Sequence, residues 1–194
     1  MYEKVNITEN HLRVLALFTM GHGREYYIRE VEKLLKVSPR TAQLILGDLE
    51  AKGVLGSTTR GKIRSYRVKA NIIARDYLLL TEAHKRIAFL GNNLVIREIV
   101  EKIAPHIHGV GLIFGSYAKG LQKKDSDLDV FVAGTYDKAA VADVSRTYGI
   151  HVSVKCYPMG IFEKESWKDI LIKEVMDNHI IIHGYDDFIR VMVG

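Results

Sequence analysis

The strongest structural signal in this 194-residue chain is a short apolar run that ends at Gly115 and Ser116 and precedes the paired acids Asp127 and Asp129. Residues 110–114 are almost entirely apolar, which predicts a short buried strand. Gly115 interrupts the run and allows the backbone to turn tightly and to approach a ligand closely. Backbone N–H groups after this turn, with the Ser116 hydroxyl beside them, suit the oxygens of a triphosphate.

The second half of this signal, residues 126–132, alternates polar and apolar residues before becoming continuously apolar, as a strand does when it enters a core. Side chains at positions i and i+2 of a strand point to the same face, so Asp127 and Asp129 are expected to project together. Carboxylates on one rigid edge are suitable ligands for Mg²⁺ or Mn²⁺, and phosphoryl-transfer sites hold two such ions about 3.5–4 Å apart. The two segments together are far more specific than an isolated Asp-x-Asp.

The chain resembles the DNA polymerase beta-like nucleotidyltransferases, particularly their minimal form, through the Gly-Ser-Tyr-Ala-Lys-Gly of residues 115–120 and the Ser-Asp-Leu-Asp-Val of residues 126–130. This resemblance covers roughly residues 94–185. It implies a small mixed sheet with helices on one side and transfer of a nucleoside monophosphate from a nucleoside triphosphate such as ATP. It also implies two Mg²⁺ ions held by acidic residues, so Asp127 and Asp129 are the predicted catalytic and metal-binding residues.

Three residues are predicted to bind the nucleotide: Gly115, Ser116 and Lys119. Lys119 follows the turn closely and is placed to neutralise triphosphate charge, and the alternative is an ordinary solvated loop lysine. A P-loop is excluded as the phosphate-binding element, because Leu121 and Gln122 follow Gly120 where a P-loop requires Lys and Ser or Thr.

One position departs from the family. Active members carry a third carboxylate on the next strand, predicted here within residues 150–156, and this segment contains no acid. Ser153 is the best match to the missing residue, and its uncharged hydroxyl coordinates Mg²⁺ only weakly. Either Glu163 or Glu165 supplies the acid, or the site binds nucleotide without efficient transfer. His151 is a candidate general base, with a solvent-facing strand histidine as the alternative.

Positive charge is concentrated in the N-terminal part of the chain. Through residue 75 there are 14 Lys and Arg against 7 Asp and Glu, a net charge of +7. Residues 76–194 contain 14 basic and 16 acidic residues, a net charge of −2. A region with such concentrated positive charge is typical of a domain that binds a polyanion.

The basic part of the chain is predicted to form three helices and a β-hairpin. Thr8 is a suitable cap for the first helix, and the second covers residues 29–35. Ser38 followed by proline starts the third helix, which runs to Gly53. A turn at residues 61–62 separates the two strands of the hairpin.

This order of elements resembles the winged helix-turn-helix domains of prokaryotic transcription regulators. The whole chain resembles prokaryotic proteins that join an ArsR-like winged helix to a minimal nucleotidyltransferase domain. By that likeness the protein binds double-stranded DNA, commonly as a homodimer. The residues predicted to meet the major groove are Arg40, Thr41, Gln43 and Leu44, and those predicted to lie along phosphates are Arg60, Lys62 and Arg64. The alternative is a winged helix that mediates only protein contacts.

We therefore expect an α+β chain in three parts: a winged helix-turn-helix domain at residues 1–70, an ordered helical connector at 71–93 and a mixed-sheet nucleotidyltransferase domain at 94–194. The connector is too apolar for a flexible linker and is expected to pack between domains or against a two-fold partner. Cys156 is the only cysteine, which fits a reducing cytoplasm, and no apolar stretch reaches transmembrane length.

The leading hypothesis is a cytoplasmic DNA-binding transcriptional regulator whose C-terminal domain binds a nucleoside triphosphate with Mg²⁺. Whether this domain also transfers the nucleotidyl group stays open. A second hypothesis is an active nucleotidyltransferase that modifies a protein or a small hydroxyl compound presented by the winged helix. A third is a catalytically inert regulator that binds no nucleotide.

Overall fold

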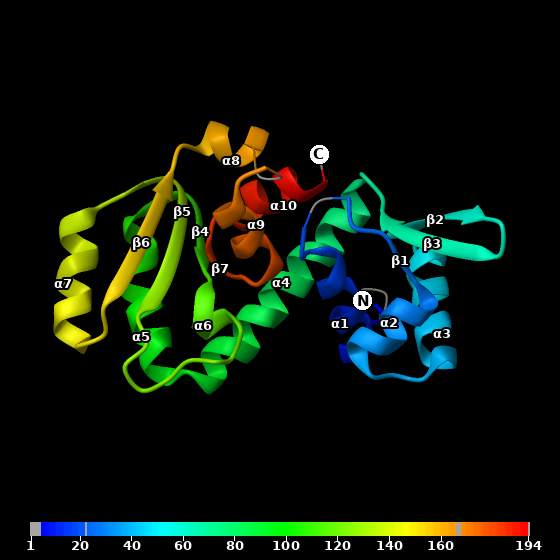
Figure 1. The fold of residues 1–194 in the computed structure, drawn as a ribbon, viewed down its shortest axis with the longest axis horizontal. Coiled ribbons are helices and arrows are strands. Elements are labelled where there is room, and N and C mark those ends of the chain that lie inside the picture. Colours follow the sequence, from blue (N-terminus) through cyan, green and yellow to red (C-terminus); the bar gives the residue numbers. More distant parts are fainter. Residues whose placement is uncertain (1–4, 22, 166–167, 194) are drawn as a thin grey trace, which may run out of the picture. The chain divides into compact units, whose positions relative to one another are not determined.

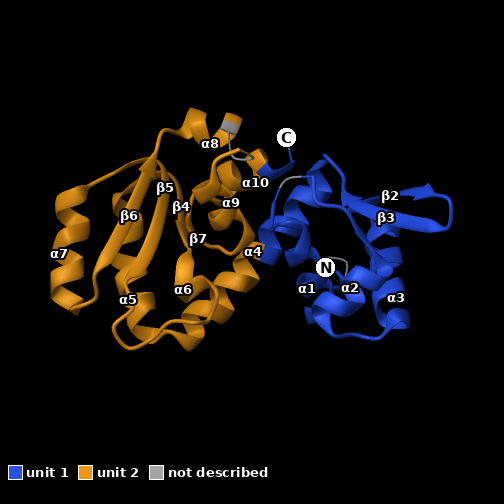
Figure 2. Ribbon diagram, viewed as in Figure 1, with its two compact units in different colours: residues 1–81, 192–194 blue, residues 82–191 orange. Residues whose placement is uncertain are grey.

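The computed structural model describes residues 5–21, 23–165 and 168–193. The chain divides into an N-terminal unit, residues 1–81 with 192–194, and a C-terminal unit, residues 82–191 (Figure 2). The division falls inside one helix of 21 residues, α4 (Ile72–Asn92). Among the described residues, no helix is both long enough and apolar enough to cross a membrane.

The N-terminal unit combines helices with a small antiparallel sheet. Its elements before α4 are α1 (Glu9–Phe18), β1 (Tyr26–Tyr27), α2 (Ile28–Leu35), α3 (Pro39–Ala51), β2 (Leu55–Arg60) and β3 (Ile63–Val68) (Figure 1). The strands lie in the order β1-β3-β2, and β2 and β3 form a hairpin. Leu15, Val31 and Leu46 come from the three helices and are fully buried, so this unit has its own apolar core.

Helix α3 begins where the sequence predicted. The Ser38 hydroxyl accepts a hydrogen bond from the backbone N–H of Thr41 at 3.0 Å, and Pro39 occupies the first helical position, where no N–H is needed. The helix ends before Gly53, whose φ of 75° lies in the left-handed region that favours glycine. Helix α3 therefore has a defined start and a defined end.

The C-terminal unit is built on a four-stranded mixed sheet. Its elements after α4 are α5 (Leu94–Ile103), η1 (Ala104–His106), β4 (Ile107–Ile113), α6 (Gly115–Ala118), β5 (Leu128–Tyr136), α7 (Lys138–Tyr148), β6 (Val152–Tyr157), α8 (Met159–Glu165), α9 (Ile170–Asp177), β7 (Ile180–His183) and α10 (Tyr185–Val193) (Figure 1). The strand order is β6-β5-β4-β7. Strands β5 and β6 are parallel, and the other two pairs are antiparallel.

Alternation along β5 places its residues on two different faces of this sheet. Leu128 and Val130 join a core that includes residues of α5 and α7. Phe131 lies on the opposite face, where its ring centroid is 5.7 Å from that of Phe162 in α8. Helices therefore contribute side chains to both faces, and the expectation of helices on one side only was wrong. Asp129 alternates with Leu128 and Val130 and shares the face of Phe131.

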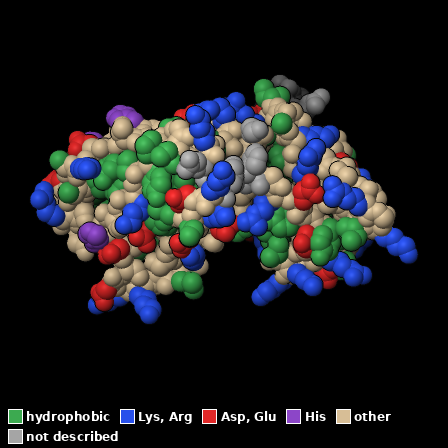
Figure 3. Space-filling model, turned by 45° about the horizontal axis from the view of Figure 1, so that its top comes forward, with side chains coloured by type: hydrophobic (Ala, Val, Ile, Leu, Met, Phe, Trp, Pro, Cys, Tyr) green, Lys and Arg blue, Asp and Glu red, His purple; other side chains and the backbone are tan. Residues whose placement is uncertain are grey.

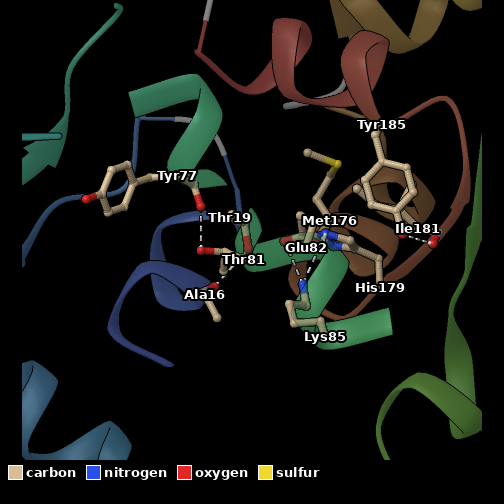
Figure 4. Close-up of polar contacts among 10 residues, drawn as sticks. All are labelled: Ala16, Thr19, Tyr77, Thr81, Glu82, Lys85, Met176, His179, Ile181 and Tyr185. Atoms are coloured by element: carbon tan, nitrogen blue, oxygen red, sulfur yellow. Dashed lines mark hydrogen bonds and ion pairs between the residues drawn. The ribbon is translucent and has the colours of Figure 1, made fainter. Parts of the chain in front are cut away.

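A buried polar cluster lies within the C-terminal unit, where α4 meets the segment before β7 (Figure 4). Lys85 Nζ lies 2.8 Å from Oε1 of Glu82, whose side chain is fully buried. His179 Nδ1 is 2.9 Å from the carbonyl of Met176, and His179 Nε2 is 3.3 Å from Lys85 Nζ. His179 Nε2 also lies 3.4 Å from Oε2 of Glu82. Among the described residues, Glu82 Oε2 has no hydrogen-bond partner.

Candidate functional site

The predicted phosphate-binding turn lies directly after strand β4, at the start of α6. Strand β4 is buried along its second half and ends at Ile113. The backbone N–H of Phe114 donates to the carbonyl of Asp129 at 3.0 Å, which ties the end of β4 to β5. Gly115 has a φ of 68°, so a residue without a Cβ atom is favoured at this turn.

The turn and the second acid are in direct contact. A Cβ atom added to Gly115 would lie less than 3.0 Å from Oδ2 of Asp129, with the Cγ and Cβ atoms of the same side chain next in distance. The glycine therefore leaves the space that the Asp129 carboxylate occupies. The two segments that the sequence singled out separately, around Gly115 and around Asp129, meet at one place.

Asp129 is the more enclosed of the two predicted metal ligands. Burial raises the pKa of its carboxyl group, and the nearby charge of Asp127 raises it further, whereas Lys155 lowers it. The Asp127 side chain, just before β5, is 56% exposed, and its Oδ2 lies 3.3 Å from Nδ1 of His151. The two acids are two residues apart at the start of β5, and the charge of Asp127 acts on the Asp129 carboxyl group.

Strand β6 places a serine beside Asp129. The parallel pairing of β5 with β6 matches Asp129 with Ser153 and Phe131 with Lys155. Ser153, the predicted match to the third acid of the family, therefore brings a hydroxyl group to this position. Two residues later the strand carries the exposed Lys155. Of the two acids considered as replacements, Glu163 is paired with Arg190 at 3.0 Å. The side chain of Glu165 lies outside the described residues.

One acid near the site was not predicted. Glu174, on α9, contributes to the raised pKa of Asp129 and forms an ion pair with Lys119, with Nζ and Oε1 2.8 Å apart. Lys119, the predicted phosphate-binding lysine, is thus held by a carboxylate in this structure. No sequence signal connected Glu174 to the site, because it comes from a separate helix far along the chain.

The residues at this site suit one nucleotide-bound cation. Mg²⁺ in nucleotide sites commonly takes one or two carboxylates and completes its coordination with water and phosphate oxygens, which Asp127 and Asp129 can accommodate. Among the described residues, no group of three or more His, Cys, Asp or Glu side chains is arranged to hold a metal ion. Ser153 and Lys155 bring no negative charge toward a second ion.

The predicted groove-contacting residues lie on α3 in the N-terminal unit. Arg40, Gln43 and Leu44 are exposed, and Leu44 retains 54% of its accessible surface. Thr41 is half-buried, and its hydroxyl lies 2.8 Å from that of Ser38, so it belongs to the helix cap. Three of the four predicted residues are thus available on one side of the helix.

The basic residues of the β2–β3 hairpin are placed in two different ways. Arg60 and Lys62 are exposed at its turn, and Lys and Arg side chains stand out from the N-terminal unit on the face drawn in Figure 3. Arg64, in contrast, forms an ion pair with Glu50 and donates from Nε to the Ser57 hydroxyl at 2.9 Å. Arg64 is therefore engaged within the unit, and sequence spacing alone did not separate it from the other two.

Comparison with known proteins bears on the C-terminal unit. Residues 95–182 match the family model of the nucleotidyltransferase domain, and this span includes the Gly-Ser turn, both aspartates and Ser153. No curated protein and no solved structure shows a significant match to the chain. Over residues 95–182 the chain is similar to nucleotidyltransferase domains, which supports nucleotidyl transfer as the general chemistry of this region.

Proposed function

We propose that the protein is a DNA-binding transcriptional regulator whose C-terminal unit binds a nucleoside triphosphate with Mg²⁺. In this proposal Asp127 and Asp129 hold the metal, while Gly115 and Ser116 contact phosphate oxygens. The contact between Gly115 and Asp129 is the observation that best supports nucleotide binding, because it brings the proposed phosphate-binding turn next to a proposed metal ligand. Lys119 leaves Glu174 and joins the triphosphate when the nucleotide enters.

Calorimetric titration of the full chain with ATP and Mg²⁺ tests nucleotide binding. We expect a measurable binding heat that the double variant Asp127→Asn/Asp129→Asn loses. Asp143→Asn is the matched control, because this acid is 72% exposed on α7 and, among the described residues, forms its ion pair with Arg146 three residues later. A flat trace for the unaltered protein, or equal heats for it and the double variant, contradicts the proposed site.

An active enzyme is the second candidate, favoured by the match to nucleotidyltransferase domains. Nucleotidyl transfer moves the α-phosphate with its nucleoside to an acceptor hydroxyl and releases pyrophosphate. Incubation of the protein with cell lysate, Mg²⁺ and ATP labelled at the α-phosphate therefore reveals the modified acceptor. Labelling that depends on Asp127 and Asp129 favours the enzyme, whereas nucleotide binding without labelling favours the regulator.

The DNA-binding part of the proposal rests on the N-terminal unit. What supports it is the order of elements, three helices with a short strand before α2 and a hairpin after α3, together with the sheet order β1-β3-β2, which fit the proposed winged helix-turn-helix. The exposed side chains of Arg40 and Gln43 on α3 reach bases, and Arg60 and Lys62 in the hairpin turn lie along phosphates. As in the winged helix-turn-helix regulators that this unit resembles, the proposed binding form is a homodimer on a two-fold site.

Gly47 offers a sharp test of groove binding. It lies on α3 one helical turn beyond Gln43 and Leu44, and a Cβ atom added there would meet nothing within 4 Å. Gly47→Ala should therefore stabilise the helix by about 0.5–1 kcal/mol. If α3 enters the major groove, the added methyl group also weakens binding to a pool of random-sequence duplexes.

Two further variants complete the DNA test. Arg40→Ala/Gln43→Ala should weaken DNA binding without loss of stability, because both side chains are exposed. Arg64→Ala should lower stability slightly and leave DNA affinity less affected, since it breaks a partly exposed ion pair with Glu50. Unchanged DNA affinity in both Gly47→Ala and Arg40→Ala/Gln43→Ala rejects recognition through α3.

A further inference from the structure

The candidate site lacks ligands for the second of the two ions that nucleotidyl transfer uses. Two Mg²⁺ ions about 3.5–4 Å apart require several carboxylates around them. Ser153 pairs with Asp129 where the family has a third acid, so the sheet supplies only a hydroxyl group at this position. Nor do the described parts of the chain hold a cluster of three acids, histidines or cysteines suited to a metal. The side chains present fit one ion and do not fit two.

Lys155 brings a positive charge to the same face of the sheet. It follows Ser153 by two residues on β6, which lies beside β5 (Figure 1), so its side chain leaves the sheet on the face shared with Asp129. Neighbouring strands are about 4.8 Å apart and two residues span about 6.6 Å, so the α-carbons of Lys155 and Asp129 are roughly 8 Å apart. The long, flexible side chain of lysine can therefore reach a ligand bound at Asp129.

The ammonium group of Lys155 acts on Asp129 and is available to a ligand. Burial and the charge of Asp127 raise the pKa of Asp129, and the charge of Lys155 opposes them. Lys155 is exposed, and within the described residues it forms no ion pair. Lys119 differs, because its Nζ lies 2.8 Å from Oε1 of Glu174. Lys155 can therefore bind an anion without first leaving a carboxylate.

We propose that Lys155 takes the place of the second metal ion, so that the site binds a nucleoside triphosphate with a single Mg²⁺ and contacts its phosphates through the Lys155 ammonium. Two carboxylates, one Mg²⁺ and one ammonium together carry the same net charge as three carboxylates with two Mg²⁺. The phosphates therefore meet as much positive charge as in a two-ion site. An ammonium donates hydrogen bonds to phosphate oxygens but offers no coordination position to an attacking hydroxyl, so the arrangement favours binding of the nucleotide over its transfer.

The inference rests on the proposed nucleotide site, and the number of bound ions tests it. The probe is α,β-methylene-ATP, whose α–β linkage is not cleaved by nucleotidyl transfer, bound to the full chain and titrated with Mn²⁺. Electron paramagnetic resonance should show one Mn²⁺ per bound nucleotide, without the spin coupling of two close ions. A protein that binds no analogue overturns the proposed function together with the inference. Two Mn²⁺ per bound nucleotide overturn the inference alone.

Lys155→Met tests the role of the ammonium group. Loss of a charge-assisted hydrogen bond should raise the Kd for the analogue with Mn²⁺ roughly tenfold or more, whereas Lys155→Arg should retain most of the affinity. Lys138→Met is the matched control, because Lys138 is also exposed but lies at the start of α7, after the end of β5 that is opposite Asp129. Equal affinities of Lys155→Met and the unaltered protein overturn the inference, even though the nucleotide binds.

The double variant Ser153→Asp/Lys155→Met tests the exchange of an ion for a lysine in the reverse direction. It supplies a third carboxylate and removes the ammonium group, so a second Mn²⁺ should bind close to the first and give a spin-coupled spectrum. Ser153→Ala/Lys155→Met is the control, because it adds no carboxylate and should still bind one Mn²⁺. If Ser153→Asp/Lys155→Met binds the analogue with only one Mn²⁺, Lys155 does not replace an ion.

Discussion

At the scale of single residues, the candidate site depends on one absent side chain. The carboxylate of Asp129 occupies the space where a Cβ atom of residue 115 would lie. The φ of Gly115, 68°, also lies in the left-handed region that favours glycine. The glycine therefore serves two purposes, because its conformation permits the turn and its missing side chain leaves room for the Asp129 carboxylate.

A comparison of the stability of Gly115→Ala with that of Gly120→Ala separates these two purposes. Both glycines have nearly equal positive φ angles, 68° and 66°, but a Cβ atom at Gly120 meets nothing within 4 Å. Each substitution should cost about 1–2 kcal/mol through backbone strain, and Gly115→Ala should cost about 1–3 kcal/mol more through its collision with Asp129. Urea denaturation measures both losses. Equal losses would show that the collision is relieved by movement of Asp129.

Ionisation of Asp129 is expected to cost stability. Burial, and then the charge of Asp127, raises the pKa of Asp129 in the folded state, so the folded chain binds this proton more tightly than the unfolded chain does. The contribution of Asp129 to the free energy of unfolding consequently falls as the pH rises from the ordinary pKa of Asp through the raised value. Asp129→Asn should be more stable than the unaltered protein at pH 7, with the gain shrinking toward pH 3. Urea denaturation across this pH range measures the difference, and a gain that grows on acidification contradicts the assignment.

At the scale of elements, short-range signals predicted the helix starts and the hairpin. Ser38 with Pro39 marked the start of α3, and the turn at residues 61–62 separates β2 from β3. Helix α7 was missed although Asp137 caps it and Gly149 follows it in the left-handed conformation.

For the candidate site, too, the local motifs were predictable from the sequence and the tertiary contacts were not. The Gly-Ser turn and the Asp-x-Asp pair carry their chemistry in local spacing, and the structure brings Gly115 against Asp129. Glu174 and Lys155 reach Asp129 only through the packing of α9 and the register of β6. Similarly, the engagement of Arg64 by Glu50 depends on how the hairpin packs against α3. Such contacts arise from tertiary structure, and the spacing of apolar residues along the sequence does not predict them.

The buried cluster of Glu82, Lys85 and His179 within the C-terminal unit gives a prediction at the same scale. Burial raises the pKa of Glu82, but Lys85 and His179 lower it more, to about 2. Lys85→Met should cost about 3 kcal/mol at pH 7, at the lower end for breaking a buried pair because Lys85 is 21% exposed. Glu82→Gln/Lys85→Met should lose less, because it leaves no unpaired buried charge. Thermal and urea denaturation compare the variants, and a double variant less stable than Lys85→Met contradicts this account.

The same cluster fixes the sign of a pH effect. Because the pKa of Glu82 is lower in the folded than in the unfolded chain, its ionised form stabilises the fold above the ordinary pKa of 4.5. This stabilisation is lost as the pH falls toward about 2. In Lys85→Met the pKa of Glu82 rises, so acid unfolding should begin at a higher pH than in the unaltered protein.

At the scale of the whole molecule, the charge is divided unevenly along the chain. The net charge is +7 through residue 75 and −2 in the remainder. A polyanion should therefore be drawn to the N-terminal unit, while the rest of the chain offers no comparable attraction. This asymmetry is consistent with two binding functions on separate parts of one chain.

Salt dependence provides the corresponding prediction. The logarithm of the DNA association constant should fall linearly with the logarithm of salt concentration, by about 0.9 for each phosphate contact. Arg60→Ala should reduce this slope by about one contact, whereas Lys138→Ala, an exposed lysine on α7, should leave it unchanged. Fluorescence anisotropy with a random-sequence duplex measures the slopes. Equal slopes for Arg60→Ala and the unaltered protein remove the hairpin turn from the DNA interface.

The serine beside Asp129 has a consequence for timing. If the site binds a nucleotide without reacting with it, the bound state ends only when the nucleotide dissociates. No chemical step returns the domain to its nucleotide-free state. The fraction of occupied molecules would then follow the cellular supply of that nucleotide in both directions. With a third acid in place of Ser153, catalysis would instead consume the bound nucleotide, and each occupied state would end after one turnover.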